Sequence, residues 1–223
     1  MLWIIPAMIL FLISDYCLGI EPADSSTVSG IVSTGWLNFA DWRIVVSAVC
    51  GIVGTGFFAA AAVAFIKYLK NKSARCGTWD RRFIRLYVAG LICACLTALY
   101  YRLASGMMIQ SFNAVWQASG GNTEAAVAAW DQVNLIQSIP YFLTVAVVNL
   151  TVSFGWVALV FKGTLPVKKV FFLAAPLLAA GIGILLDSLI TLPFDGIATG
   201  FESIGWLVMF LCARRAVQRD PMK

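Results

Sequence analysis

Long apolar stretches alternate with shorter polar segments along the whole chain of 223 residues. Most of these stretches approach the ~20 residues that an α-helix needs to cross the hydrocarbon core of a bilayer. Lipid offers the backbone no hydrogen bonds, so a spanning segment must satisfy its own N–H and C=O groups, which favours helices. The pattern predicts an all-α integral membrane protein, a bundle of about six transmembrane helices in one domain over residues 1–223. We expect the spans at residues 2–19, 44–67, 83–104, 140–161, 170–187 and 197–213.

The apolar pattern of the third span does not stop where the membrane should end. It continues past Arg102 as far as Trp116 and breaks at Gly120-Gly121. Asn122 follows the break and is a typical N-cap residue for a new helix, which then runs into the fourth span near Pro140. We therefore expect residues 105–139 to form a helical hairpin that protrudes on the outer side.

Basic residues gather in the short polar segments, most densely between the second and third spans. This group consists of Lys67, Lys70, Lys72, Arg75, Arg81, Arg82 and Arg85. Short loops rich in Lys and Arg stay on the cytoplasmic side of a membrane, because their translocation is disfavoured. Further basic residues follow the fourth and sixth spans, at Lys162, Lys168, Lys169 and from Arg214 onward. The pattern predicts a multi-pass protein of the cell membrane with both termini in the cytoplasm.

The first apolar stretch allows two interpretations. A signal peptide cleaved after Gly19 would also show an apolar run followed by small residues. However, no Lys or Arg precedes the run, and Asp15 would lie just before the cleavage point, which is atypical for a signal peptide. We favour a retained first span.

The amino-acid composition supports the membrane assignment and argues against several kinds of partner, catalytic site and metal site. The chain is 61% hydrophobic and 12% charged, with a mean hydropathy of +0.86, whereas a soluble domain has about 25% charged residues. The net charge of +5 comes from basic loops beside the spans, so no nucleic-acid partner is expected. The chain has no histidine, which removes Ser-His-Asp catalysis and the common zinc and haem ligation. The six cysteines show no CxxC spacing, and we expect no metal and no cofactor.

Three stretches, in this order, resemble a known family. They are ISDYCLGIEP at residues 13–22, DWRIVVSAVCGIVGTGFFAAAAVAFIKYLK at residues 41–70, and the apolar sequence from FKGTLPVKK to IGWLVMFL at residues 161–211. The family is one of uncharacterised bacterial polytopic membrane proteins, known only as a domain of unknown function. The resemblance covers nearly the whole chain, and it implies a retained first span, in which Asp15 matches an acid of the family. It implies no activity. Family members often carry a histidine in the third span, where this chain has Leu-Tyr-Tyr-Arg at residues 99–102.

Several polar residues lie inside the predicted spans or at their outer ends. They are Asp15, Arg102, Asn149, Asp187, Asp195 and Glu202. Charges within a bilayer are costly, so they indicate a functional site unless they lie near the headgroups, where long side chains reach water. One interpretation is an outward-open pocket for a cation, an amine or a lipid headgroup, and the other is a purely structural crown of polar groups. In either case we expect Arg102 to pair with Asp15, Asp187 or Glu202.

Aromatic residues near this cluster also allow two interpretations. Trp156, Trp206, Tyr100 and Tyr101 could line such a pocket, or they could anchor the bundle at the membrane interface.

Three classes of function remain open at this point. Binding or transport through the polar pocket is the first. The second is a structural or accessory subunit whose outer hairpin contacts another membrane protein or a second copy of the chain. An enzyme is the least favoured, because the YD and GxGD signatures of intramembrane aspartyl proteases are absent around Asp187 and Asp195. Membrane lipids are expected partners in every case.

Overall fold

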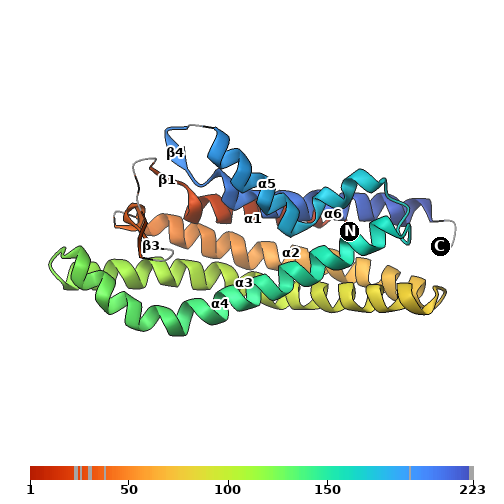
Figure 1. Ribbon diagram of the computed structural model, residues 1–223, viewed down its shortest axis with the longest axis horizontal. Helices are drawn as coiled ribbons and strands as arrows, with labels where there is room; N and C mark the ends of the chain where they lie inside the picture. Colours follow the sequence, from red (N-terminus) through yellow and green to blue (C-terminus); the bar gives the residue numbers. More distant parts are fainter. Residues whose placement is uncertain (23–24, 26, 30–31, 38, 191, 221–223) are drawn as a thin grey trace.

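The protein is almost entirely helical in its computed structural model, which describes residues 1–22, 25, 27–29, 32–37, 39–190 and 192–220 (Figure 1). The helices are α1 (Ile4–Gly19), α2 (Asp41–Ser73), α3 (Thr78–Ala118), α4 (Thr123–Phe161), α5 (Pro176–Leu189) and α6 (Phe201–Arg219). Short 3-10 helices are η1 (Thr34–Trp36), η2 (Lys169–Ala174) and η3 (Ile197–Gly200). Short strands are β1 (Glu21–Pro22), β2 (Thr27–Ser29), β3 (Val32–Ser33) and β4 (Phe194–Asp195). The all-α prediction is confirmed.

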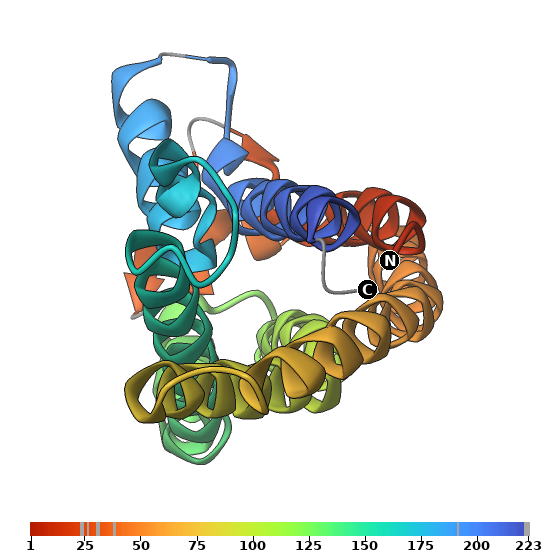
Figure 2. The same cartoon turned by 90° about the vertical axis from the view of Figure 1, so that its right-hand side faces the viewer.

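The six helices form a closed ring. Each helix packs against the next one in sequence, and α1 packs against α6 to complete the circle, as the view along the bundle shows (Figure 2). Within the described part of the chain, three segments are long and apolar enough to cross a membrane, namely α2, α3 and residues 197–219. Shorter apolar helices are α1, the 145–161 part of α4, and α5. The membrane character is therefore supported, while the count of six spans stays a prediction.

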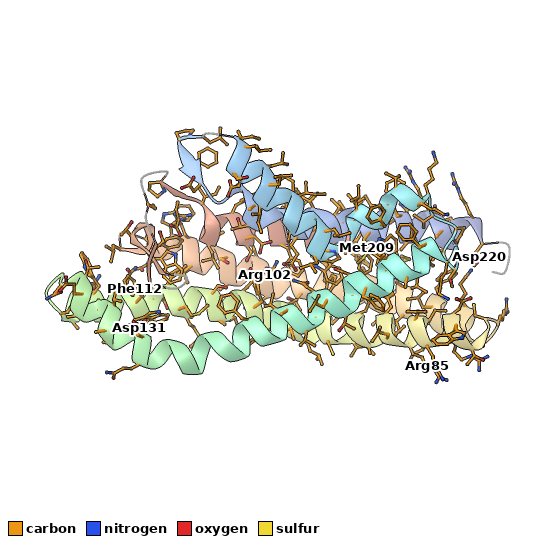
Figure 3. The ribbon with its side chains drawn as sticks, viewed as in Figure 1. Arg85, Arg102, Phe112, Asp131, Met209 and Asp220 are labelled. Carbon is orange, nitrogen blue, oxygen red and sulfur yellow. The ribbon has the colours of Figure 1, made fainter. Side chains whose placement is uncertain are left out.

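Connections that are predicted to lie on the same side of the membrane are found at the same end of the bundle. The chain termini, the α2–α3 turn and the segment after α4 lie toward one end, whereas the α3–α4 turn and the short strands lie toward the other (Figure 1). We call these the terminal end and the hairpin end. Arg85 points away from the bundle near the terminal end (Figure 3). One basic residue of this group, Lys72, forms a salt bridge with Asp220 at 2.7 Å. The carboxylate of Asp220 also accepts a hydrogen bond from the hydroxyl of Tyr68.

Two continuous helices, α3 and α4, pack together and meet at the Gly120-Gly121 break, while the position of this hairpin outside the membrane stays a prediction. α3 has 41 residues and is therefore about 60 Å long, twice the ~30 Å hydrocarbon thickness. Asn122 caps α4 by accepting a hydrogen bond from the Ala125 N–H at 3.1 Å, as predicted. Trp130 and Phe112 pack edge to face within the hairpin, and Phe112 meets Trp36 of the preceding loop. On the described part of the hairpin's apolar stripe, Ala126 and Trp130 are therefore buried next to the chain's own loop.

The fifth span differs from its predicted bounds of residues 170–187. Residues 169–174 form η2 rather than α-helix, and α5 begins only at Pro176. Proline lacks the N–H that a helix interior needs, and it pushes Ala175 into the extended conformation seen there. α5 has 14 residues, about 21 Å, which is less than the bilayer core requires. The residues on both sides of Pro176 are apolar, so the hydrophobic pattern alone does not show that the helix begins at this proline.

A two-residue sheet joins the ends of α1 and α6. Glu21 of β1 lies opposite Asp195 of β4 in an antiparallel pair. Gly196 follows with a φ of +96°, and a Cβ at this position would overlap the carbonyl oxygen of Gly19. Both the conformation and the close approach require glycine here.

Gly196→Ala is expected to lower the free energy of unfolding by about 1–3 kcal/mol, because alanine would be strained at positive φ and would collide with the α1 backbone. Gly181→Ala is the matched control, since Gly181 lies in α5 and a Cβ added there would meet no other atom within 4 Å. Thermal denaturation in detergent should show a lower midpoint for the first variant alone. Equal midpoints would contradict the role of Gly196.

Reporter fusions at Ser73 and at Gly121 are expected on opposite sides of the membrane. Ser73 is the last residue of α2 and Gly121 lies in the α3–α4 connection, so the two positions flank opposite ends of α3, which is long and apolar enough to cross a bilayer. Alkaline phosphatase should be active at Gly121 and inactive at Ser73, and a fluorescent-protein fusion should show the reverse. The same signal at both positions would refute the predicted orientation.

Candidate polar site

A buried ion pair lies at the centre of the ring. Arg102 of α3 donates from Nη2 to Oδ1 of Asp15 on α1 at 2.9 Å, and each side chain is only 7% exposed. Arg102 lies near the middle of the bundle's length (Figure 3). Its Nη1 donates to the carbonyl oxygen of Ala98, one turn earlier, at 3.1 Å. Of the acids that the sequence placed at the depth of Arg102, the structure pairs it with Asp15.

Residues of α1 and α2 make room for the guanidinium. Its central carbon lies 3.7 Å from the centroid of the Phe11 ring, a cation–π contact that the ring quadrupole favours. On α2, a Cβ at Gly51 would lie 2.9 Å from Cδ of Arg102, so a larger residue would displace the arginine stem. The Nε of Arg102 is buried and has no hydrogen-bond partner among the described residues. The arginine thus keeps one unused donor inside the bundle.

Hydrogen bonds tie Asp15 and its neighbour to two further helices. Oδ2 of Asp15 accepts a hydrogen bond from the Ser203 hydroxyl of α6 at 2.6 Å. The preceding residue, Ser14, donates to the carbonyl oxygen of Ser47 on α2 at 3.0 Å. The polar residues of α1 therefore face α2, α3 and α6 at one level of the bundle.

Glu202, which is half-buried, is the second acid of the site. It lies in the first turn of α6, where the helix dipole favours a negative charge. Its Oε1 accepts a hydrogen bond from the Trp206 indole at 3.2 Å, and Asn149 of α4 hydrogen-bonds the same carboxyl group. Among the described residues, no Lys or Arg forms a salt bridge with Glu202. Arg102 is close enough to interact with it electrostatically, but its guanidinium contacts Asp15 instead.

These residues enclose a small space, which we call the inner cavity, of about 60 Å³. Its polar lining consists of Asp15, Thr97, Arg102, Asn149, Thr199, Glu202 and Ser203. Its aromatic lining consists of Phe11, Phe58, Tyr101 and Trp206. A water molecule needs roughly 10–15 Å³ by this measure, so the cavity has room for a few waters or a small solute.

A larger space of about 280 Å³, the outer pocket, lies beside the inner cavity. The two spaces share Asp15, Tyr101, Arg102 and Thr199 in their linings, so the ion pair stands between them. Glu21 lies in the outer pocket and accepts hydrogen bonds from the Trp36 indole at 2.9 Å and from the hydroxyl of Ser33.

The six predicted site residues divide into two groups. Asp15, Arg102, Asn149 and Glu202 come together around the inner cavity. Asp195 is instead exposed, because the β1–β4 pairing carries it to the surface at the hairpin end. Asp187 ends up on α5 and lines neither the inner cavity nor the outer pocket.

The candidate aromatic residues divide in the same way. Tyr101 and Trp206 line the inner cavity. Trp156 is fully buried elsewhere and donates its indole N–H to the carbonyl oxygen of Phe171 at 2.9 Å. Tyr100 is 43% exposed on the outside of the bundle.

Two kinds of residue that line or support the site were not predicted from the sequence. Ser203 and Thr97 carry hydroxyl groups that are common in transmembrane helices, and nothing in the sequence separates them from other such residues. Arg43 had a clearer signal, as a lone cation at the start of an apolar stretch. It donates from Nε to the carbonyl oxygen of Cys17 at 2.8 Å and from Nη2 to that of Ile20 at 2.6 Å. A cation at this position satisfies the free carbonyl groups at the end of α1.

Within the described part of the chain, no three His, Cys, Asp or Glu side chains lie close enough together to hold a metal. The inner cavity offers two carboxylates, and one of them is already paired with Arg102.

Arg102→Gln is expected to lower the thermal denaturation midpoint, because Asp15 would remain buried without its cation. Removing one partner of a buried pair typically costs about 3–5 kcal/mol. Adding Asp15→Asn to the same chain should recover part of the loss, since the orphaned charge disappears. Arg85→Gln, at an exposed position, is the control for the change in net charge and should leave the midpoint unchanged. A silent Arg102→Gln, or a double variant that is worse than the single one, would contradict the pairing.

The comparisons with known proteins identify the chain at the level of a family. No curated protein and no solved structure matches it. A model of one family, described as a family of unknown function (DUF6796), matches residues 1–217. The match covers α1 to α5 and nearly all of α6, and so it includes every residue of the inner cavity. The protein belongs to the family of unknown function DUF6796.

Proposed function

We propose that this membrane protein binds a small cation in the inner cavity, and that a small primary amine or ammonium ion is the best fit. The observation that carries the proposal is Glu202, a half-buried carboxyl group whose direct partners among the described residues are the neutral side chains of Trp206 and Asn149. A buried charge without a counter-charge is costly. A bound cation would supply that counter-charge.

Charge balance favours a cation over an anion. Arg102 and Asp15 compensate each other, which leaves the carboxylate of Glu202 as the excess charge of the cavity. An ammonium group could donate hydrogen bonds to Glu202 and to the hydroxyl of Thr97, while the aromatic rings accommodate its positive charge. The rings of Phe58 and Trp206 already meet edge to face at 5.2 Å on one wall.

The volume of the inner cavity further restricts the size of the ligand. Pockets that hold drug-sized molecules typically enclose about 300–1,000 Å³, whereas the inner cavity encloses about 60 Å³. A whole lipid headgroup is therefore disfavoured at this site, although it was one of the candidates that the sequence suggested.

The outer pocket offers a route of entry. It is wider than the inner cavity and carries the additional acid Glu21, and the Asp15–Arg102 pair separates the two spaces. Entry would require the guanidinium of Arg102 to move. In the other direction, packed side chains including Phe65, Tyr87 and Phe210 fill the core toward the terminal end. In this proposal, the structure corresponds to a state that is open toward the hairpin end alone.

The alternative function, a structural or accessory subunit, relied on a free apolar surface of the hairpin. Of the apolar stripe, the described side chains of Ala126 and Trp130 are buried against the chain's own residues, so these two residues do not offer such a surface. The inner cavity favours solute binding.

Glu202→Gln is expected to weaken the binding of methylammonium by about 10- to 100-fold, since a hydrogen bond to a charged group is worth about 1.5–3 kcal/mol. Isothermal titration of the purified protein with methylammonium, ammonium and sodium chloride would measure the dissociation constants.

Glu124→Gln removes the same charge from an exposed position on the hairpin and should leave binding unchanged. Absence of methylammonium and ammonium binding to the unmodified protein, or equal loss in both variants, would refute the proposed site. Binding of sodium alone would refute the preference for an amine.

A further inference from the structure

A second, apolar groove lies on the outside of the ring between η2, α5 and α6. It encloses about 230 Å³, and its lining includes Val170, Leu173, Ile182, Phe201, Ile204 and Val208. Val170 is 58% exposed, so the groove opens on the surface of the bundle. It exists because α5 begins only at Pro176 and η2 occupies the rest of the distance to the terminal end.

Hydrogen bonds from α4 hold the walls of the groove in place. The hydroxyl of Ser153 accepts a hydrogen bond from the backbone N–H of Leu177 at 3.0 Å, in the first turn of α5. Trp156 donates to the carbonyl oxygen of Phe171 in η2 at 2.9 Å. On the other side, Gly205 lets α6 approach α5 so closely that a Cβ there would lie 2.5 Å from the Cβ of Ala179. The groove is therefore a fixed feature of the fold.

Three exposed cations lie at the terminal end of this groove. Lys168 and Lys169 directly precede Val170. Arg215 follows Val208 by seven residues, which places it on the same face of α6 about 10 Å closer to the terminal end.

Two acids of the terminal end pair with other lysines. Asp80 pairs with Lys162 at 3.7 Å, and Asp220 pairs with Lys72 at 2.7 Å. Among the described residues, no salt bridge involves Lys168, Lys169 or Arg215. The mouth of the groove thus carries positive charge next to apolar surface.

We propose that this groove is a binding site for an anionic phospholipid. One acyl chain would lie against η2, α5 and α6, and the phosphate would lie among Lys168, Lys169 and Arg215. The combination of an apolar groove with cations at a single end matches a lipid, in which the charge and the chain are covalently joined. Basic clusters beside transmembrane helices attract anionic headgroups for the same reason. This site does not depend on the proposed cation site, which lies inside the ring.

Native mass spectrometry of the full chain in detergent can compare phosphatidylglycerol with phosphatidylcholine of identical acyl chains. We expect phosphatidylglycerol to remain bound preferentially. The triple variant K168Q/K169Q/R215Q should weaken its binding on the order of 10- to 100-fold, because each basic residue near the headgroup contributes to the attraction. Ile182→Trp, which fills the groove and leaves the cations in place, should also weaken it.

The matched control is K67Q/K70Q/R75Q, which removes three exposed positive charges near the same end of the molecule but away from the groove. It should leave phosphatidylglycerol binding unchanged. An equal loss in the control would show diffuse attraction and would overturn the proposal, as would equal binding of the two lipids. Glycerol 3-phosphate has the charge without the chains and should not bind. If it bound as tightly as the lipid, the site would be a phosphate site and the proposal would fail.

Discussion

Burial of one guanidinium constrains the whole ring. An arginine inside a helical bundle needs a counter-charge and partners for most of its donors, because the bilayer and the apolar core cannot solvate it. Arg102 of α3 obtains its counter-charge from Asp15 on α1 and its aromatic contact from Phe11 of the same helix, and its stem crosses α2 at Gly51. Asp15 in turn is held by Ser203 of α6. The contact that closes the ring, between α1 and α6, is therefore also the contact that completes the ion pair.

The same constraint explains why the cavity lies where it does. Toward the hairpin end, Trp36, Phe112 and Trp130 form a small core between η1 and the ends of α3 and α4, and toward the terminal end a larger aromatic core fills the ring. Between these two cores, polar groups interrupt the packing at the level of Asp15, Arg102 and Glu202. Side chains that must hydrogen-bond cannot fill space as densely as Phe or Leu, so small polar cavities form beside them. The proposed cation site uses a space that the buried charges themselves create.

The short α5 is a second departure from a regular bundle. A helix of 14 residues leaves part of this segment's length to η2, whose backbone groups need partners. Trp156 of α4 donates to a carbonyl oxygen of η2, and Ser153 accepts from a backbone N–H in the first turn of α5. Irregular backbone at membrane depth would require such partners. The groove proposed as a lipid site follows directly from this arrangement.

The spacing of apolar residues and the positions of glycine and capping residues in the sequence determined most of the helices, the break at Gly120-Gly121 and the cap at Asn122. These features depend on neighbouring residues alone. The sequence also determined that Arg102 needs an acid. Depth along a helix can be counted from the sequence, but several acids shared that depth, and only the packing of the helices around the ring decided that Asp15 faces Arg102 while Asp187 does not. The strand pairing that turns Asp195 outward likewise joins residues far apart in the chain. Local sequence signals determine where a helix begins and ends. The face that each helix presents to its neighbours is instead set by tertiary contacts between segments that are far apart in the sequence.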